Sequence, residues 1–547
     1  MSVPNQARDA FATWRAAVND DWYADDPHLR SLIAHHGRQD VSDDLAVFGR
    51  VCARQIDPLV RENNRDEHLP RLRRWDGQGH RIEAVDFHPS YHEIGRLAYR
   101  SGVMARYADR GRELETLALL YLFAQNGEGG HACPMACTAG LIQILQADDD
   151  DHTEWLTRLT DPDYDTHFHG AQFLTEVQGG SDVGANAVKA EETSDGWRIT
   201  GEKWFCSVID ADLFLVTARA DDRLGTRGLG AFAVPRNLPD GSTNHFAIRR
   251  LKFKLGTRSM ASAEVDFQGA HAVRVGDFRR TVDVVLNTSR LYNAICSCGT
   301  MQRAWREAQG YAEVRRAFGQ PILAFPSVAR IVARLRTEAY AARGTTFWLA
   351  QLKDSGEASP LAWRMLVNLN KYWTSNAGTT AVRDAIEVLG GNGAIEEFSV
   401  LPRLLRDAIV CEAWEGGHNL LCAQVLKDSH RGMHEHLFAL VRSIGASGPR
   451  LDAVEARWAS LLELPAAQAS AHMRDVVDEL RPVVQAAALT AEAASERDPL
   501  IPVVAEHLLA ITERGWDPLE DAGLMDRVGQ LTRRRVSTPD LRPTTRR

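Results

Sequence analysis

The feature that most restricts the fold is a block of short alternating segments, residues 169–275, between two long helical stretches. Within it, β-branched and aromatic runs such as residues 213–218 and 230–234 are separated by turn signals, including Asp195-Gly196. Period-two patterns at this spacing predict an antiparallel β-domain. Because the expected strands are gathered in one block and do not alternate with helices, a doubly wound sheet is excluded. The predicted class is α+β, mostly α.

The rest of the chain shows helical periodicity, broken by one polar stretch and ended by a run of arginines. The last fifteen residues, from Arg533 to Arg547, hold six Arg and one Asp, a composition typical of disorder. We predict, in order, a helical domain (1–168, with a polar extended excursion near 70–90), the β-domain (169–275), a second helical domain (276–432), a C-terminal helical extension (433–535) and an Arg-rich disordered tail (536–547).

Composition narrows the class of protein. Of the 547 residues, 44% are apolar and 25% are charged, with a net charge of −9, which is typical of a globular protein and does not require a nucleic-acid partner. The start of the chain lacks a secretory pattern and no apolar run is long enough for a membrane span. We therefore expect a cytoplasmic protein with no membrane partner. The eight cysteines form no zinc-ligand pattern, so no metal is predicted.

Two segments of the β-domain have residues suited to a planar ligand. At 175–183, Gly179 and Gly180 allow backbone N–H groups to approach a ligand closely, and Thr175 and Ser181 supply short donors. At 201–207 an aromatic pair precedes Ser207, which could cover one ring face and donate to its edge. Taken singly, a tight surface turn and two core aromatics explain these patterns as well.

Two segments of the second helical domain contain charged residues that could act on a ligand. Arg315, with Phe318 three residues later, could pair with a diphosphate and pack on a heterocycle, although cationic helix ends are common. Glu415 lies between Trp414 and a glycine pair. A carboxylate desolvated there would have the raised pKa that a general base near neutrality requires. A solvated helix start is the alternative.

In order and spacing, the four segments resemble the signatures of the acyl-CoA dehydrogenases. The resemblance covers roughly residues 117–427, and residues 73–89, residues 250–259 and the C-terminal extension look like the AidB (alkylation-response) branch. It implies the acyl-CoA dehydrogenase fold: an N-terminal helical domain, a central antiparallel β-barrel and a C-terminal four-helix bundle, here followed by an extra helical domain. FAD would lie in an extended pose between barrel and bundle.

The resemblance also implies roles for individual residues. Glu415 takes the place of the base that removes the α-proton of an acyl thioester, while flavin N5 accepts the β-hydride. Substrate contacts are implied for Trp414, Arg290 and Ser181. FAD contacts are implied for Leu174, Thr175, Gly180, Ser181, Phe205, Ser207, Arg315, Phe318, Glu387, Gly390, Gly391, Gly417 and Asn419.

Arg315, Phe318 and residues 387–391 match segments that complete the FAD site of a neighbouring subunit, which implies a homo-oligomer, a tetramer or a dimer. Three departures from the family pattern change individual FAD hydrogen bonds: Ala317 replaces a hydroxyl residue, Glu387 replaces Gln, and residues 325–327 lack the usual Gln.

The expected activity is α,β-dehydrogenation of an acyl thioester carried by CoA or by a carrier protein, with the electron acceptor left open. Two alternatives remain. One is a flavin enzyme that oxidises a C–N bond or another secondary-metabolite substrate. The other is an AidB-like DNA-binding protein with vestigial dehydrogenase activity, whose Arg-rich tail would contact phosphates. The retained Glu415 favours dehydrogenation.

Overall fold

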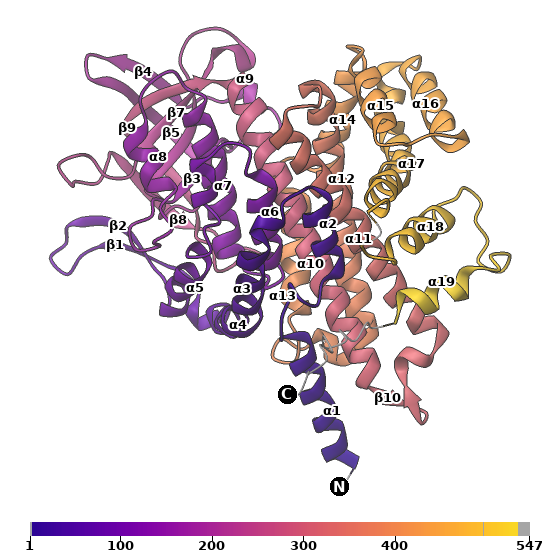
Figure 1. Cartoon of the computed structure of the whole chain (residues 1–547). Helices are drawn as coiled ribbons and strands as arrows, with labels where there is room; N and C mark the ends of the chain where they lie inside the picture. Colours follow the sequence, from indigo (N-terminus) through magenta and orange to yellow (C-terminus); the bar gives the residue numbers. More distant parts are fainter. Residues whose placement is uncertain (1–2, 496, 534–547) are drawn as a thin grey trace, which may run out of the picture.

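The computed structural model describes residues 3–495 and 497–533, so the predicted tail at 536–547 lies outside the described residues (Figure 1). The N-terminal region is helical. All twelve residues of its helix α6 are buried, which is typical of a helix in the centre of a core. Its helices are α1 (Val3–Val18), α2 (Pro27–His35), α3 (Ser42–Val51), α4 (Asp57–Asn63), α5 (Pro89–Tyr99), α6 (Glu113–Ala124), α7 (Gly129–Gln146) and α8 (Thr153–Leu159).

The polar excursion predicted near residues 70–90 is an antiparallel hairpin of β1 (Arg71–Trp75) and β2 (Arg81–Asp86). Its turn forms locally, because the Asp76 carboxylate accepts hydrogen bonds from the backbone N–H groups of Gln78 and His80, both at 2.8 Å. The hairpin docks on the central sheet through the buried Glu83, whose Oε2 accepts from the N–H of Ile248 at 2.8 Å.

The predicted β-block forms one seven-stranded sheet, and its pairings close into a barrel in the order β6–β4–β5–β9–β7–β6. The strands are β3 (Gly170–Phe173), β4 (Lys189–Thr193), β5 (Gly196–Ser207), β6 (Leu213–Arg219), β7 (Leu229–Pro235), β8 (Phe246–Leu251) and β9 (Ser262–Asp277). Closure places Phe214, Val216 and Phe232 in a separate buried core. The turn signal at Asp195-Gly196 is confirmed: Ser194 and Asp195 form the β4–β5 turn, and Gly196 begins β5 opposite Thr193.

The expectation of a wholly antiparallel barrel was wrong in one respect. Strand β3 pairs with β6 in parallel along its full length, and β4 meets the end of β6 in parallel. Strands β3, β4 and β6 share one direction: the β4–β5 hairpin reverses the chain, and the connection from β5 to β6 reverses it again. Residue patterns within each strand predict the strands, but not this order of pairing.

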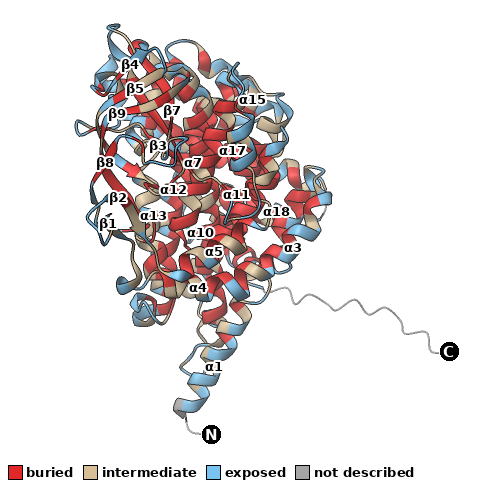
Figure 2. Ribbon diagram, turned by 90° about the vertical axis from the view of Figure 1, so that its left-hand side faces the viewer, coloured by how far each residue is buried: buried red, intermediate tan, exposed pale blue. Residues whose placement is uncertain are grey.

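Helices follow the barrel, and the second to fourth of them are long: α9 (Phe278–Arg280), α10 (Asn287–Val314), α11 (Pro326–Ser355), α12 (Pro360–Leu389), α13 (Leu401–Ala413) and α14 (His418–Ser429). Helices α10, α11 and α12 pack against one another and contribute many buried residues to the main core (Figure 2). Even charges are buried here: the Arg303 guanidinium lies 2.9 Å from Asp57 and 2.8 Å from Glu307. Such pairing offsets the cost of desolvation.

A short hairpin, β10 (Arg316–Ala317) with β11 (Gln320–Pro321), projects between α10 and α11. The C-terminal helices α17 and α18 pack on α11. These last helices are α15 (Met433–Ser443), α16 (Pro449–Leu462), α17 (Ala466–Ala493), α18 (Ile501–Ile511) and α19 (Leu524–Leu531).

Among the described residues, no helix is both long and apolar enough to cross a membrane. The five-part domain division stays a prediction.

Candidate active site

Glu415 lies in the tight turn between α13 and α14. Its φ is +57°, in the left-handed region that non-glycine residues rarely occupy, and Gly416 follows at +98°. A left-handed conformation at a non-glycine residue costs on the order of 1–3 kcal/mol and persists only when surrounding contacts impose it. Gly417 then caps the start of α14. The W-E-G-G sequence is therefore a turn that presents one carboxylate.

Two cations, the partly buried Arg290 and the buried Lys371, hold this turn by its carbonyl groups. Arg290 on α10 donates through Nε to the carbonyl oxygen of Glu415 at 3.1 Å, and through Nη1 to Asn368 Oδ1 at 2.7 Å. Lys371 on α12 donates through Nζ to the carbonyls of Glu412 (3.0 Å) and Gly416 (2.9 Å). The turn is thus clamped from two neighbouring helices.

Sequence reasoning missed Lys371. The signal that could have revealed it is a lysine inside the otherwise buried run of α12, since a fully buried ammonium needs acceptors. Arg290 was identified, but the structure shows it on the backbone of Glu415. Its predicted contact with substrate stays a prediction.

Electrostatics at the turn favour a basic carboxylate. Burial raises the pKa of Glu415, although the positive charges of Arg290 and Lys371 act in the opposite direction. Burial also lowers the pKa of Lys371 to about 8. Within the part of the chain that the structure describes, no side chain or backbone group hydrogen-bonds the Glu415 carboxylate, while two cations hold its backbone. The carboxylate is free to accept a proton from a ligand.

Trp414 connects this turn to the barrel. Its ring packs against the barrel core, and its indole Nε1 is buried without a hydrogen-bond partner among the described residues. A second link runs from α10 to β3 to α7: Ser289 Oγ donates to Gln172 Oε1 at 3.2 Å, and Gln172 Nε2 donates to the carbonyl of Cys137 at 3.1 Å. Glu415 therefore lies at the boundary between barrel and helical bundle.

The two motifs of the barrel come together through a buried ion pair. Lys203 Nζ lies 2.9 Å from Glu176 Oε1 and donates to the carbonyl of Leu174 at 3.1 Å. The backbone N–H of Trp204 donates to the carbonyl of Thr175 at 3.0 Å. Glu176 and Lys203 were not predicted as site residues, yet they fix the loop after β3 against strand β5.

The surface made by these motifs suits a flat ligand. Gly179 has a φ of +117°, and a Cβ at Gly180 would come within 2.7 Å of Thr175 Oγ1, so the backbone there stays bare. On β5, the side chain of Phe205 is 54% exposed, an unusual state for a barrel aromatic, and Ser207 follows two residues later. The predicted contacts Leu174, Thr175, Gly180, Ser181, Phe205 and Ser207 thus belong to two adjoining segments.

The other predicted FAD residues lie elsewhere in the chain. Phe318 is 97% exposed at the tip of the β10–β11 hairpin, and Arg315 beside it is exposed. Glu387, Gly390 and Gly391 are exposed after the last turn of α12. Arg315 follows Arg290 by 25 residues at the far end of α10, about 37 Å away at 1.5 Å per residue. One chain does not bring this group to Glu415.

Gly417 and Asn419 lie at the start of α14, just after the turn that carries Glu415. Their predicted FAD contacts, like the other cofactor contacts, stay predictions.

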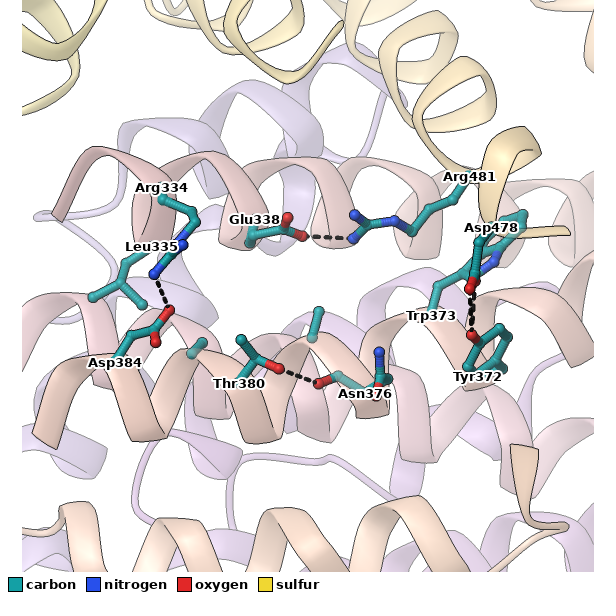
Figure 3. A pocket seen from close by; sticks show the side chains of 12 residues that line it. Arg334, Leu335, Glu338, Tyr372, Trp373, Asn376, Thr380, Asp384, Asp478 and Arg481 are labelled. Carbon is teal, nitrogen blue, oxygen red and sulfur yellow. Dashed lines mark hydrogen bonds and ion pairs between the residues drawn. The ribbon is translucent and has the colours of Figure 1, made fainter. Parts of the chain in front are cut away.

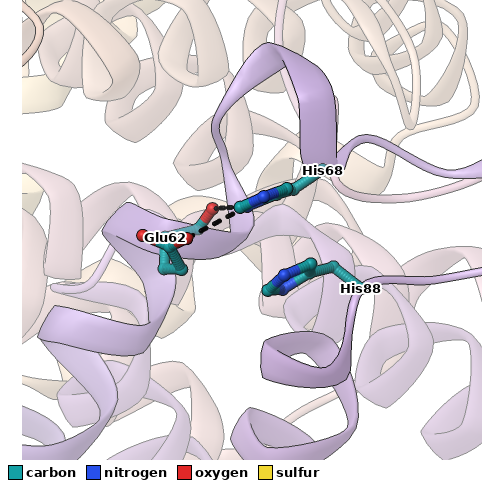
Figure 4. Close-up of side chains that lie close together, drawn as sticks. All are labelled: Glu62, His68 and His88. Atoms are coloured by element: carbon teal, nitrogen blue, oxygen red, sulfur yellow. Dashed lines mark hydrogen bonds and ion pairs between the residues drawn. The ribbon is translucent and has the colours of Figure 1, made fainter.

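One group of side chains among the described residues could hold a metal ion: Glu62, His68 and His88, at the base of the β1–β2 hairpin (Figure 4). Their geometry has another explanation. The two imidazoles stack with centroids 3.7 Å apart and planes inclined by 13°, which directs their in-plane lone pairs parallel to each other. His68 Nδ1 bonds the Glu62 carbonyl at 2.8 Å and His88 Nδ1 bonds Ser90 Oγ at 2.7 Å. We assign no metal here.

A cavity of about 280 Å³ lies between α11, α12 and α17, away from the predicted site residues (Figure 3). Its charges neutralise one another: Arg334 lies 2.7 Å from Asp384 and Arg481 lies 2.8 Å from Glu338. Tyr372 also donates to Asp478 at 2.7 Å. The cavity offers no unpaired charge to a ligand, so we do not place the active site there.

Comparisons with known proteins show which family the chain resembles along most of its length. Residues 14–166 match the N-terminal domain of the adaptive response protein AidB, and residues 171–270 and 278–430 match the middle and C-terminal domains of acyl-CoA dehydrogenases. The chain is 34% identical to AidB of Escherichia coli over 75% of this chain and 78% of that protein. It is 32% identical to acyl-CoA dehydrogenase family member 11 of Caenorhabditis elegans, over 74% and 70%.

A solved structure of the Caenorhabditis elegans protein ACDH-11 in complex with C11-CoA superposes with a TM-score of 0.80 at 27% identity, covering 91% of this chain and 92% of that one. The structure titled Bd2924 apo-form gives 0.81 at 26% identity, with 87% and 98% covered. These likenesses confirm the predicted fold class, including the extra C-terminal helices.

Proposed function

The chain belongs to the acyl-CoA dehydrogenase family and is an oxidoreductase of the AidB type, and on this basis we propose that it binds FAD and dehydrogenates an acyl thioester across Cα–Cβ. The observation that carries the proposal is the Glu415 carboxylate: desolvated, without a hydrogen-bond partner in the described chain, and held at the boundary between barrel and bundle.

FAD fits the residues present. The bare backbone at Gly179-Gly180, the exposed Phe205 and the Ser207 hydroxyl form an open surface suited to the flavin ring. Trp414 packs on the same barrel and keeps a buried indole N–H without a partner among the described residues. When bound, FAD would supply the acceptor for the hydride from Cβ. Thr175, Ser181 and Ser207 would donate hydrogen bonds to it.

The protein's own residues perform the proton chemistry. An α-proton beside a thioester is weakly acidic, so a carboxylate removes it only if the carboxylate is desolvated and the carbonyl is polarised by fixed donors. Glu415 accepts the proton at a carboxylate oxygen. The clamp by Arg290 and Lys371 fixes the turn from which that carboxylate projects, and Trp414 helps to exclude water.

An acyl-CoA is the substrate we propose, because a structural relative binds C11-CoA on the same fold. A carrier-protein thioester would present the same carbonyl and α-carbon to Glu415.

The proposed binding of FAD is tested by the flavin content of the protein. The purified protein should show a flavin absorbance band at about one flavin per chain, whereas a folded, colourless protein that also refuses added FAD would refute the proposal.

We further propose a homo-oligomer in which a second subunit completes each FAD site. The support is the exposed group at Arg315, Phe318 and Gly390, about 37 Å from the Glu415 end of α10 by helix rise. The side chain of Phe318 is 97% exposed at the tip of its hairpin. Burying such an apolar ring against a second subunit would be favourable.

Arg315→Glu should weaken FAD binding at least tenfold, because a guanidinium–diphosphate pair would be replaced by repulsion between like charges. Equilibrium dialysis with FAD measures this, alongside light scattering for the assembly. Arg383→Glu, at an exposed position on α12, is the matched control and should bind FAD like the wild type. A monomeric wild type with full FAD occupancy would contradict the shared site.

A further inference from the structure

We propose that Lys254 is a positioning residue that, acting through Ser262, directs the hydroxyl proton of Ser207 toward the ligand on the barrel surface. The inference rests on the proposed function, because Ser207 is one of the residues expected to contact the flavin. Lys254 itself belongs to none of the predicted contacts and takes no part in the proton transfer to Glu415.

Two hydrogen bonds connect Lys254 to Ser207 through Ser262. Lys254 Nζ donates to Ser262 Oγ at 3.0 Å and to the carbonyl of Met260 at 2.9 Å. Ser262 Oγ lies 3.0 Å from Ser207 Oγ, and the two residues are direct partners in the β5–β9 register.

An ammonium group has only donors, so the Ser262 oxygen accepts from Lys254. The hydroxyl of Ser262, polarised in this way, is favoured as the donor to Ser207. The Ser207 oxygen accepts that proton and keeps its own proton for a ligand. Without the lysine, the serine pair could equally run in the opposite direction and turn an oxygen lone pair toward the ligand.

The loop that carries Lys254 is fixed in place. It joins β8 to β9 and lies against α13, where a Cβ at Gly256 would come within 2.4 Å of the Arg406 carbonyl. The N–H of Thr257 donates to Asp407 Oδ1 at 2.6 Å. Lys254 is therefore placed before any ligand binds, as a positioning role requires.

The charge state of Lys254 suits this role. Burial lowers its pKa to about 8, while nearby Cys133 and Asp407 favour the charged form. At neutral pH it remains mostly an ammonium. Lys252, two residues earlier, differs: its Nζ lies 2.8 Å from Glu264 and 3.4 Å from the Trp204 ring centroid, so its charge is already paired. Of these two lysines, Lys254 is the one whose side chain is hydrogen-bonded to Ser262 and through it to Ser207.

A directed donor and a positive charge both favour the reduced flavin, which carries more negative charge than the oxidised form. Removing the side chain of Lys254 or the hydroxyl of Ser262 should therefore disfavour reduction of the flavin. We expect Lys254→Met and Ser262→Ala each to lower the equilibrium constant for two-electron reduction about tenfold, which corresponds to about 30 mV. Lys254→Arg should retain most of the wild-type value, because it keeps the charge and the donors.

The experiment equilibrates the FAD-loaded protein with a reference dye under anaerobic reduction and compares both single variants with the double variant. Because Lys254 and Ser262 act in one chain, the double variant should match Lys254→Met and not the sum of the two singles. Lys189→Met, which removes an exposed positive charge from β4, should leave the potential unchanged. If Lys254→Met does not fold, Ser262→Ala alone tests the chain.

The possible failures can be told apart. A wild type that binds no FAD would overturn the proposed function and this inference with it. FAD-loaded variants with the wild-type potential, or single effects that add up in the double variant, would overturn this inference alone.

Discussion

Glu415→Gln is expected to slow flavin reduction by an acyl thioester about 10²–10⁴-fold, the usual contribution of a positioned general base. The amide keeps the shape of the side chain but cannot accept the α-proton. The backbone clamp from Arg290 and Lys371 does not depend on the carboxylate, so the turn, FAD binding and thioester binding should persist. Stopped-flow absorbance under anaerobic conditions measures the rate.

Glu412→Gln is the matched control, because Glu412 lies one turn earlier on α13 and hydrogen-bonds the clamp through its backbone carbonyl, while its carboxylate lies 3.7 Å from His418 Nε2. This control variant should reduce flavin at close to the wild-type rate.

The rate of flavin reduction by the wild type should fall as pH falls through the pKa of Glu415, because only the ionised carboxylate is a base. Burial raises this pKa above its ordinary value. Wild-type rates in Glu415→Gln would show that another group acts as the base.

Lys203→Met should destabilise the protein by about 3–5 kcal/mol, the usual cost of leaving one partner of a buried ion pair uncompensated. Burial by itself would raise the pKa of Glu176, and Lys203 together with the N–H of Ala187 holds it below the ordinary value. Glu176 thus contributes stability above the ordinary glutamate pKa, and this contribution is lost as pH falls. Denaturant unfolding at neutral pH measures the loss.

The double variant Lys203→Met with Glu176→Gln should recover part of the lost stability, because no buried charge then remains. Lys189→Met on the neighbouring strand β4 is exposed and should change the stability by less than about 0.5 kcal/mol. Equal losses for Lys203→Met and Lys189→Met would show that the buried pair does not hold the two barrel motifs together.

Features that depend on neighbouring residues could be predicted from the sequence. The strands of the barrel and the extended excursion near residues 70–90 follow from local periodicity and turn chemistry. The parallel pairing of β3 with β6 could not, because it depends on the path of the chain through the intervening hairpin.

The same limit applies to the candidate site. Glu415 was singled out because its motif is local. The two cations that hold its turn lie far away in the sequence: Arg290 is 125 positions before it and Lys371 is 44 positions before it. Ser207 and Ser262 meet only because β5 pairs with β9. A single sequence identifies residues that suit a site but does not show which distant side chains orient them.

The most direct test of the central claim is anaerobic titration of the FAD-loaded protein with acyl-CoA thioesters of graded chain length. The proposed function predicts that at least one of them bleaches the flavin band and yields one equivalent of the α,β-unsaturated thioester. A flavin that dithionite reduces, but that stays oxidised with every thioester, or that only an amine reduces, would contradict Glu415-dependent dehydrogenation.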